Sequence, residues 1–202
     1  MTKRIAEIKR KTKETSIAVK LNIDGTGKSK INTGIGFLDH MLELFSFWGR
    51  FDLEISAKGD FKIDIHHTNE DIGLVLGQAF KDSLGDKKSI NRMGSAAVPM
   101  EDVTANVALD ISGRGSFKLN IIPTVFSPPA GQDGYEFKYI EHFFDSFAKK
   151  IGANLNIRLE NPNNDLHATL EPIFKALGIA LDQATQIDPR RKGIPSTKGV
   201  ID

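Results

Sequence analysis

The sequence predicts an α/β protein that contains an internal repeat. Segments in which apolar and polar residues alternate, as in strands, are interspersed with segments in which apolar residues recur at helical spacing. The order of helix, strand and helix occurs twice along the chain. With 202 residues, 40% of them hydrophobic and 26% charged, the chain can bury a core as one domain or as two small halves.

The first half, taken as residues 1–90, starts with the locally basic RIAEIKRKTK, which we interpret as a charged first strand or a frayed end. TSIAVKLNI alternates like a strand and ends in the turn DGTG, and GIGFLDHMLELFSFWG has the spacing of an amphipathic helix. FDLEISAKGDFKIDI predicts two strands on either side of Gly59 and Asp60. Helical spacing returns from about Thr68 to Leu84.

The second half, residues 91–202, repeats this alternation. SAAVPMEDVTANVALDIS and GSFKLNIIP have the character of strands, and PTVFSPPAGQDG, with three prolines and two glycines, predicts an irregular loop. A predicted helix in EFKYIEHFFDSFAKKIG, a strand in ANLNIRLE and a helix in LEPIFKALGIALDQAT complete the chain. A duplicated α/β unit is therefore expected.

Composition excludes several classes of function. The chain has no cysteine, so disulfides, thiolate metal sites and cysteine nucleophiles are excluded, and His, Asp and Glu remain as metal ligands. A net charge of +1 argues against a nucleic-acid partner. No signal peptide and no uncharged run of about 18 residues is visible, so we expect no membrane partner and a cytoplasmic protein. No serine nucleophile motif, P-loop or dinucleotide fingerprint occurs.

The histidines indicate a metal site. His40 precedes His66 by 26 residues and His142 precedes His167 by 25, and DIHHTNED, residues 64–71, adds His67 beside His66 and ends in two acids. A glutamate follows His66 and His167 four residues later, so each pair lies on one helix face. All five histidines fit this scheme, which predicts two half-sites of similar build.

The types of ligand limit the set of metals that could bind, but they do not identify one metal. Imidazole and carboxylate suit Mn, Fe, Zn, Ni or Co, and their order of affinity does not decide among them. Adjacent histidines on a helix diverge by about 100°, so His66 and His67 should serve different metals, or one metal and one partner group.

Seven motifs, GFLDHM, DIHHTNEDIGLVLGQA, NRMGSAAVPMED, DISGRG, IEHFF, FKALGIAL and GIPSTKGVI, together resemble the imidazoleglycerol-phosphate dehydratase family of histidine biosynthesis. The similarity runs from about Lys9 to Ile201. It implies two fused, similar halves, each a mostly antiparallel sheet backed by helices, which is an α+β form of the α/β class. It also implies a homo-oligomeric shell of 24 subunits, active sites shared between subunits, and two Mn²⁺ per active site.

The resemblance implies that the enzyme eliminates water from imidazole glycerol phosphate to give imidazole acetol phosphate, and it assigns roles to particular residues. Glu14 is the implied acid/base group, and Glu101 and Asp102 would support a histidine or the substrate hydroxyls. From the residues alone, Glu14 would be a surface glutamate and PSTKG a flexible tail. The implied metal ligands, among which Glu70 and Glu171 also count as catalytic, are His40, His66, His67, Glu70, His142, His167 and Glu171; the implied phosphate-binding residues are Arg92, Arg114, Ser196 and Lys198.

The second metal motif departs from the family pattern. The family has HHxxE where this chain has LHATLE, so one histidine is missing, and Leu166 or Ala168 occupies its place. Water or Asp165 could fill the vacancy, with a lower metal affinity. Because proline favours the first helical turn, Pro172 predicts a helix that starts near Glu171 and leaves His167 in the loop.

Three functions therefore stay open. The first is an active dehydratase. The second is a metal-binding, shell-forming relative with weak or no activity, which the incomplete second motif favours. The third is a metal-dependent hydrolase, because two ions held by His and Glu can also generate hydroxide.

Overall fold

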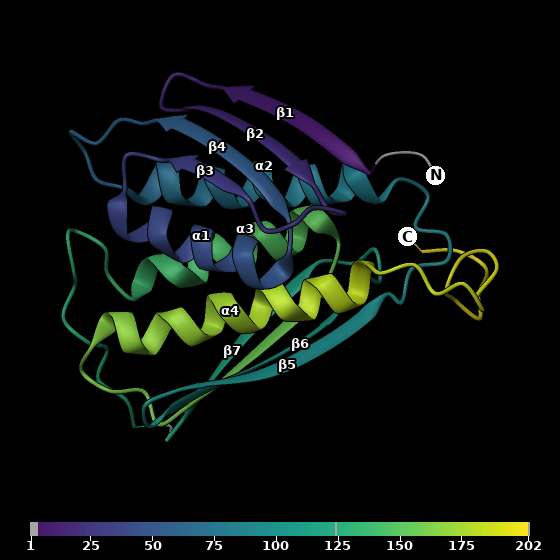
Figure 1. Ribbon diagram of the computed structural model, residues 1–202. Helices are drawn as coiled ribbons and strands as arrows, with labels where there is room; N and C mark the ends of the chain where they lie inside the picture. The colour runs from purple at the N-terminus through teal and green to yellow at the C-terminus, as the bar shows by residue number, and fades with distance from the viewer. Residues whose placement is uncertain (1–3, 124, 202) are drawn as a thin grey trace.

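The computed structural model describes residues 4–123 and 125–201, and in this part of the chain two four-stranded sheets enclose four helices (Figure 1). The first half contains β1 (Ile5–Lys11), β2 (Ser16–Asn22), β3 (Ser29–Asn32), α1 (Gly36–Gly49), β4 (Asp52–Lys58) and α2 (His66–Leu84). The second half contains β5 (Met93–Met100), β6 (Val103–Asp110), β7 (Ser116–Ile122), α3 (Lys138–Ile151), β8 (Asn154–Glu160) and α4 (Leu166–Thr185).

The two sheets have the same topology. Their strand orders are β1-β2-β4-β3 and β5-β6-β8-β7, and in each sheet only the last pair of strands is parallel. Parallel neighbours need a crossover connection, which α1 provides between β3 and β4 and α3 provides between β7 and β8. The predicted pair of similar halves, each a mostly antiparallel sheet backed by helices, is confirmed. The boundary after residue 90 stays a prediction.

The core lies between the sheets in four layers: sheet, two helices, two helices and sheet (Figure 1). Alternating residues of the central strands face the helices, so Val19 lies beside Ile55 in one sheet and Val107 beside Ile157 in the other. Helices from different halves meet in the middle, where α1 packs on α4 and α2 packs on α3. The repeat is therefore joined through helices and not through a continuous sheet.

The outer faces of the two sheets differ in charge. The first sheet exposes lysines and glutamates, including the ion pair of Lys20 with Glu54 at 3.2 Å. The outer face of the second sheet is mostly small and neutral, with Ser95, Ala97 and Ala108 exposed. Equivalent positions of the repeat have thus diverged on the surface while the buried faces remained alike.

Two glycines of α2 allow this helix to approach α3 closely. A Cβ built at Gly73 would lie 2.6 Å from the carbonyl oxygen of Phe143, and one at Gly77 would lie 2.7 Å from that of Phe147. Both distances are too short for a side chain, and in each case the obstacle is backbone. The spacing between α2 and α3 therefore depends on glycine at these positions.

Gly73→Ala is expected to destabilise the protein by about 1–3 kcal/mol, because the methyl group overpacks the contact between α2 and α3. Helix propensity alone predicts the opposite sign, since alanine is favoured over glycine by about 1 kcal/mol. Urea denaturation would measure the change. Gly36→Ala is the matched control, because a Cβ at Gly36 meets nothing within 4 Å. Equal stability of the two variants would contradict the close-packing argument.

Two details of the predicted strands are wrong. The short strand β3 was not predicted, because its four residues are too few to display alternation. The second strand predicted after Gly59 does not form. The amide of Ile63 donates to the carbonyl of Asp60 at 2.9 Å, and Asp64 accepts the amide of His66 at 2.8 Å. These residues form the turn that starts α2.

The predicted start of the last helix is also wrong. α4 begins at Leu166, and the side chain of Asp165 caps it by accepting the amides of His167 at 2.8 Å and Ala168 at 3.3 Å. Pro172 lies inside the helix. The cap and the burial of Leu166 hold the first turns in place although proline removes one helical N–H.

The irregular loop predicted in the second half is present in the structure. The loop predicted from Pro123 to Gly134 is irregular, although Thr124 within it lies outside the described residues. Pro99 lies on β5, which is an edge strand, where proline is tolerated. No helix in the described ranges has the length and apolar character needed to cross a membrane.

Candidate metal centre

Four of the five histidines belong to two clusters, and each cluster takes residues from both halves of the chain. The first cluster contains His40 of α1 with His167 and Glu171 of α4, and the second contains His66 and Glu70 of α2 with His142 of α3. The packing of α1 on α4 and of α2 on α3 brings these partners together. The similar sequence spacing of histidines within each half therefore reflects the repeat, and it does not show which histidines are in contact.

The first cluster is the more closed of the two. Nε2 of His167 lies 2.6 Å from Oε2 of Glu171, and Nε2 of His40 lies 3.5 Å from the same oxygen. One ligand atom from each of these residues can be chosen so that all lie within 4.8 Å of one another. The residues are buried or half-buried, so a cation between them would be partly shielded from water.

Glu171 is held as a carboxylate. Its second oxygen, Oε1, pairs with Lys175 one turn further along α4. Burial opposes ionisation of Glu171, but the hydrogen bonds from Lys175 and His167 outweigh it and lower the pKa of the carboxyl. Glu171 is therefore an anionic donor at pH values where an ordinary glutamate begins to take up a proton.

The second cluster contains the same pair of a histidine and a glutamate four residues apart on one helix, and it is more exposed to solvent. Nε2 of His66 lies 3.4 Å from Oε2 of Glu70, one helical turn away, and the rings of His66 and His142 lie 4.4 Å apart. His142 is exposed, whereas His66 and Glu70 are half-buried. A pair of histidines with one glutamate is thus available here too.

His67 belongs to neither cluster. Its Nδ1 lies 3.0 Å from Oδ2 of Asp60, and this hydrogen bond, with smaller contributions that include the charge of Glu14, raises the pKa of His67. Fixing Nδ1 on a carboxylate leaves Nε2 of the ring for another partner. Glu14 itself is exposed in the turn between β1 and β2, close enough for its charge to reach this histidine.

A buried aromatic chain links the two clusters. Phe37 makes an edge contact with His167, with centroids 6.0 Å apart, and stacks on Tyr135 at 5.1 Å. The hydroxyl of Tyr135 donates to Asn69 at 2.9 Å, next to Glu70 in the second cluster. The clusters are therefore parts of one packed region.

A protein-family model described as imidazoleglycerol-phosphate dehydratase matches residues 33–181, which include every residue of both clusters. The chain belongs to the imidazoleglycerol-phosphate dehydratase family. The enzymes of this family are hydro-lyases, so the chain is a lyase, as the sequence resemblance predicts. The dehydratase of Thermoanaerobacter sp. (strain X514) is 50% identical over 198 residues, 98% of this chain and 100% of that protein. That of Pelobacter propionicus is 48% identical over 98% of this chain and 99% of its own length.

Solved dehydratase structures share the fold. The structure from Pyrococcus furiosus, in complex with (S)-C348, has a TM-score of 0.80 and 32% identity, and covers 96% of this chain and 99% of that chain. The structure from Staphylococcus aureus has a TM-score of 0.77 and 33% identity, with coverage of 91% and 99%. The family's α/β architecture with two similar halves is therefore present in this chain.

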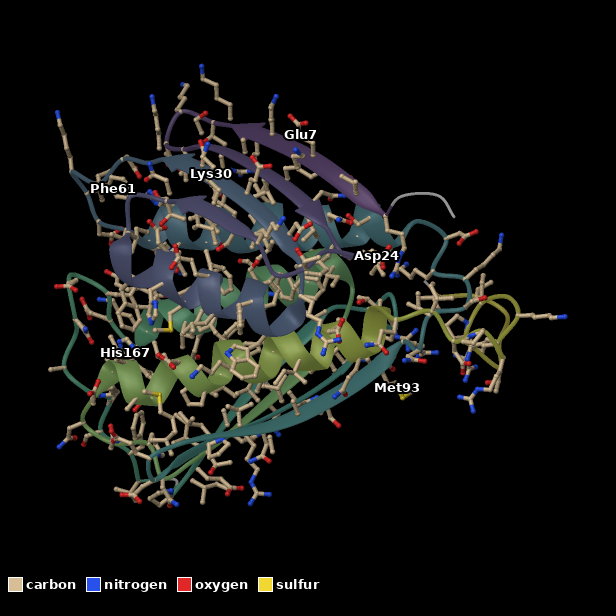
Figure 2. All side chains as sticks on the ribbon, in the orientation of Figure 1. Glu7, Asp24, Lys30, Phe61, Met93 and His167 are labelled. Carbon is tan, nitrogen blue, oxygen red and sulfur yellow. The ribbon has the colours of Figure 1, made fainter. Side chains whose placement is uncertain are left out.

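The residues predicted to bind phosphate lie at the other end of the helix layers. The amide of Arg92 donates to the carbonyl of Ala184 in the last turn of α4, whereas His167 is in the first turn. At 1.5 Å per residue, these ends of α4 are about 26 Å apart. Figure 2 shows His167 and Met93, the neighbour of Arg92, at opposite ends of α4.

Arg92 ties the C-terminal tail to the second sheet. Its guanidinium donates to both oxygens of Asp110, at 2.6 and 2.9 Å, and to the carbonyl of Pro195 at 2.9 Å. Ser196 follows Pro195, and its hydroxyl accepts the amide of Lys198 at 3.2 Å. A guanidinium has five N–H donors, so these contacts do not exhaust Arg92 as an anion-binding group.

Arg114 lies near the same end of the molecule as Arg92. It follows β6, and its neighbour Gly115 packs against Lys149 in the last turn of α3. Glu101 and Asp102, by contrast, are exposed in the turn between β5 and β6. No hydrogen bond joins either acid to a histidine within the described part of this chain.

Sequence reasoning missed two residues beside the histidines. Lys175 carries a usable signal, because it follows Glu171 by four residues on the same helix face. Asp60 carries no such signal. It reaches His67 because the chain turns after Asp60, whereas the alternating residues of FKIDI predict a strand there.

Proposed function

We propose that the chain catalyses the metal-dependent elimination of water from imidazole glycerol phosphate, giving imidazole acetol phosphate in histidine biosynthesis. Relatives that are about half identical over 98% of the chain carry the name of this dehydratase. The observation that supports metal dependence best is the pair of His/Glu clusters, each with two imidazoles and one carboxylate.

The donors fit a divalent transition metal. Imidazole nitrogens and carboxylate oxygens without thiolate suit Mn²⁺, which is the ion we propose for both clusters. Glu171, kept anionic by Lys175 and His167, would hold one ion with His40 and His167, and Glu70 would hold the other with His66 and His142. When bound, the ions would act as Lewis acids that orient the substrate imidazole and stabilise its negative charge.

Glu14 is the proposed acid/base group. Its carboxylate lies in the turn between β1 and β2, and its charge contributes to the raised pKa of His67. From there it could take a proton from a substrate carbon or return one to the product. Such assistance is worth about 10²–10⁴-fold in rate, so binding and metal chemistry would supply the remainder.

The proposed active site combines residues of different subunits. A small phosphorylated imidazole cannot touch His167 and Arg92 of one chain, since they lie at ends of α4 about 26 Å apart. The phosphate would therefore be bound by Arg92, Arg114, Ser196 and Lys198 of a second copy. The small, neutral outer face of the second sheet is suited to contact between copies, in keeping with a homo-oligomer of up to 24 subunits.

Mixing two inactive variants tests this arrangement. His167→Ala removes a metal ligand, and Lys198→Ala removes an exposed cation of the tail. Each variant alone should have little turnover, and co-assembly of the two after unfolding should restore part of it, because some sites then receive both intact residues. If mixed assemblies stay as inactive as their parents, the site is built within one chain and the proposal fails.

A weakened relative is the second candidate, because α4 has Ala168 directly after the chelating His167, where α2 has His67 directly after His66. The chelates His66–Glu70 and His167–Glu171 are equivalent, so Ala168, and not Leu166, occupies the place of the missing histidine. The closed contact of His167 with Glu171 at 2.6 Å nevertheless favours a cluster that still binds an ion.

Ala168→His is expected to tighten metal binding by the protein by about 10–100-fold, the range typical of one supporting group in a metal site. Titration of the metal-free protein with Mn²⁺ would measure this. Leu166→His is the control: both positions are buried, so either substitution puts a polar ring at a buried position, but only Ala168 has the place in α4 that His67 has in α2. Tighter binding in Leu166→His alone would shift the alignment of the repeat by one residue.

A further inference from the structure

We infer that Asp71 is a positioning residue that clamps the turn carrying Glu14 onto α2. Asp71 is the last residue of DIHHTNED, and neither metal cluster uses it. The inference deepens the proposed function, because it rests on Glu14 as the acid/base group. The contact between Asp71 and the turn that carries Glu14 involves none of the residues of the two metal clusters.

The turn between β1 and β2 is organised by its own backbone. The amide of Thr12 donates to the carbonyl of Thr15 at 2.9 Å, and the hydroxyl oxygen of Thr12 accepts the amides of Glu14 at 3.1 Å and Thr15 at 3.0 Å. Thr12, Lys13 and Glu14 are exposed. These contacts fix the shape of the turn, but they do not attach it to the rest of the protein.

Asp71 supplies that attachment from both sides of the turn. Its Oδ2 accepts the hydroxyl of Thr15 at 2.5 Å and forms an ion pair with Arg10 of β1. Thr15 is 3% exposed, so this anchor is shielded from water. One carboxylate oxygen thus holds the strand that enters the turn and the residue that leaves it.

The clamp links Glu14 to the metal ligands through a single helix. Asp71 directly follows Glu70 and lies one turn of α2 from His67. Strand pairing of β1 with β2 extends only to Lys11 and Ser16, so pairing alone leaves Glu14 outside the ladder. Without Asp71 the hairpin would persist, while Glu14 would no longer be held at a fixed place beside the histidines.

Loss of the clamp should therefore affect chemistry more than folding. Misplacing a catalytic group by about 1 Å can cost about 10²-fold in rate. We expect Asp71→Asn and Thr15→Val each to lower kcat by up to about 10²-fold, with KM and metal content unchanged. Thr15→Ser keeps the hydroxyl donor and should restore kcat.

The motion of the turn gives a readout that does not depend on activity. Trypsin should cut after Lys13 faster in Asp71→Asn and Thr15→Val than in the parent, because the exposed turn opens more often. Asp24→Asn is the matched control. It removes an ion pair with Arg4 at the opposite end of the same hairpin, and it should change neither kcat nor cleavage after Lys13.

Unchanged kcat and unchanged cleavage in Asp71→Asn and Thr15→Val would overturn the inference. A fall in kcat that follows a loss of bound metal would also overturn it, since Asp71 would then act through Glu70. If Glu14→Gln keeps full turnover, the role proposed for Glu14 fails instead, and protection of Lys13 by Asp71 still reports on the clamp.

Discussion

Glu14→Gln is expected to lower kcat by about 10²–10⁴-fold while metal content and assembly stay unchanged. Glutamine keeps the size of the side chain and one acceptor oxygen but cannot accept a proton at neutral pH. Glu14 is exposed, and its side chain makes no hydrogen bond among the described residues, so the substitution should not affect folding. Steady-state assays with imidazole glycerol phosphate would measure the change.

Glu7→Gln serves as the control for Glu14→Gln. Glu7 is an exposed acid on the same hairpin, paired with Lys9 at 2.8 Å, and nothing places it near a histidine. The two variants alter the net charge equally. Similar kcat values for both variants would show that the proton is moved by another group.

Pairs of histidine variants are expected to lose different numbers of metal ions. His40 and His167 lie in one cluster, so the double variant with alanine at both positions should still bind the ion of the second cluster. His40 and His66 lie in different clusters, so their double variant should bind none tightly. Elemental analysis after dialysis against Mn²⁺ would measure both.

This comparison separates contacts between halves from contacts within a half. If clusters formed within each half, His40 and His66 would share an ion and the outcomes of the two double variants would be exchanged. Circular dichroism should show that both variants keep the fold, because the three histidines are only partly buried. Equal metal loss in the two variants would contradict the assignment of clusters.

The sequence predicts the helices that carry the histidines better than it predicts which histidines meet. Helical spacing around His40 and His142 gives α1 and α3 directly, and helical spacing from about Thr68 gives α2, which starts slightly earlier, at His66. Contact between α1 and α4 depends on tertiary packing. The spacing of a histidine and a glutamate within one helix does not say which other helix packs against it. Likewise, apolar and polar residues alternate within DLEIS and within TSIAVKLNI. This pattern predicts two strands, but it does not predict their order in the sheet.

Local rules fail where another contact outweighs them. Proline at position 172 argues for a helix that starts near Glu171, yet the Asp165 cap and buried Leu166 set the start at Leu166. FKIDI alternates like a strand, yet its Asp64 accepts the amide of His66 at the start of α2, and the preceding Asp60 binds the ring of His67. Both errors lie beside the clusters, where polar residues have partners that their own segment does not reveal.

The most direct test of metal-dependent dehydration is the metal content of the unmodified protein, measured together with turnover on the same sample. We expect one Mn²⁺ in each cluster, two per chain, with turnover that is lost on chelation and regained when Mn²⁺ is returned. One ion per chain without turnover would mean that the cluster of His40, His167 and Glu171 no longer supports catalysis. Turnover that survives complete removal of metal would contradict the proposed function.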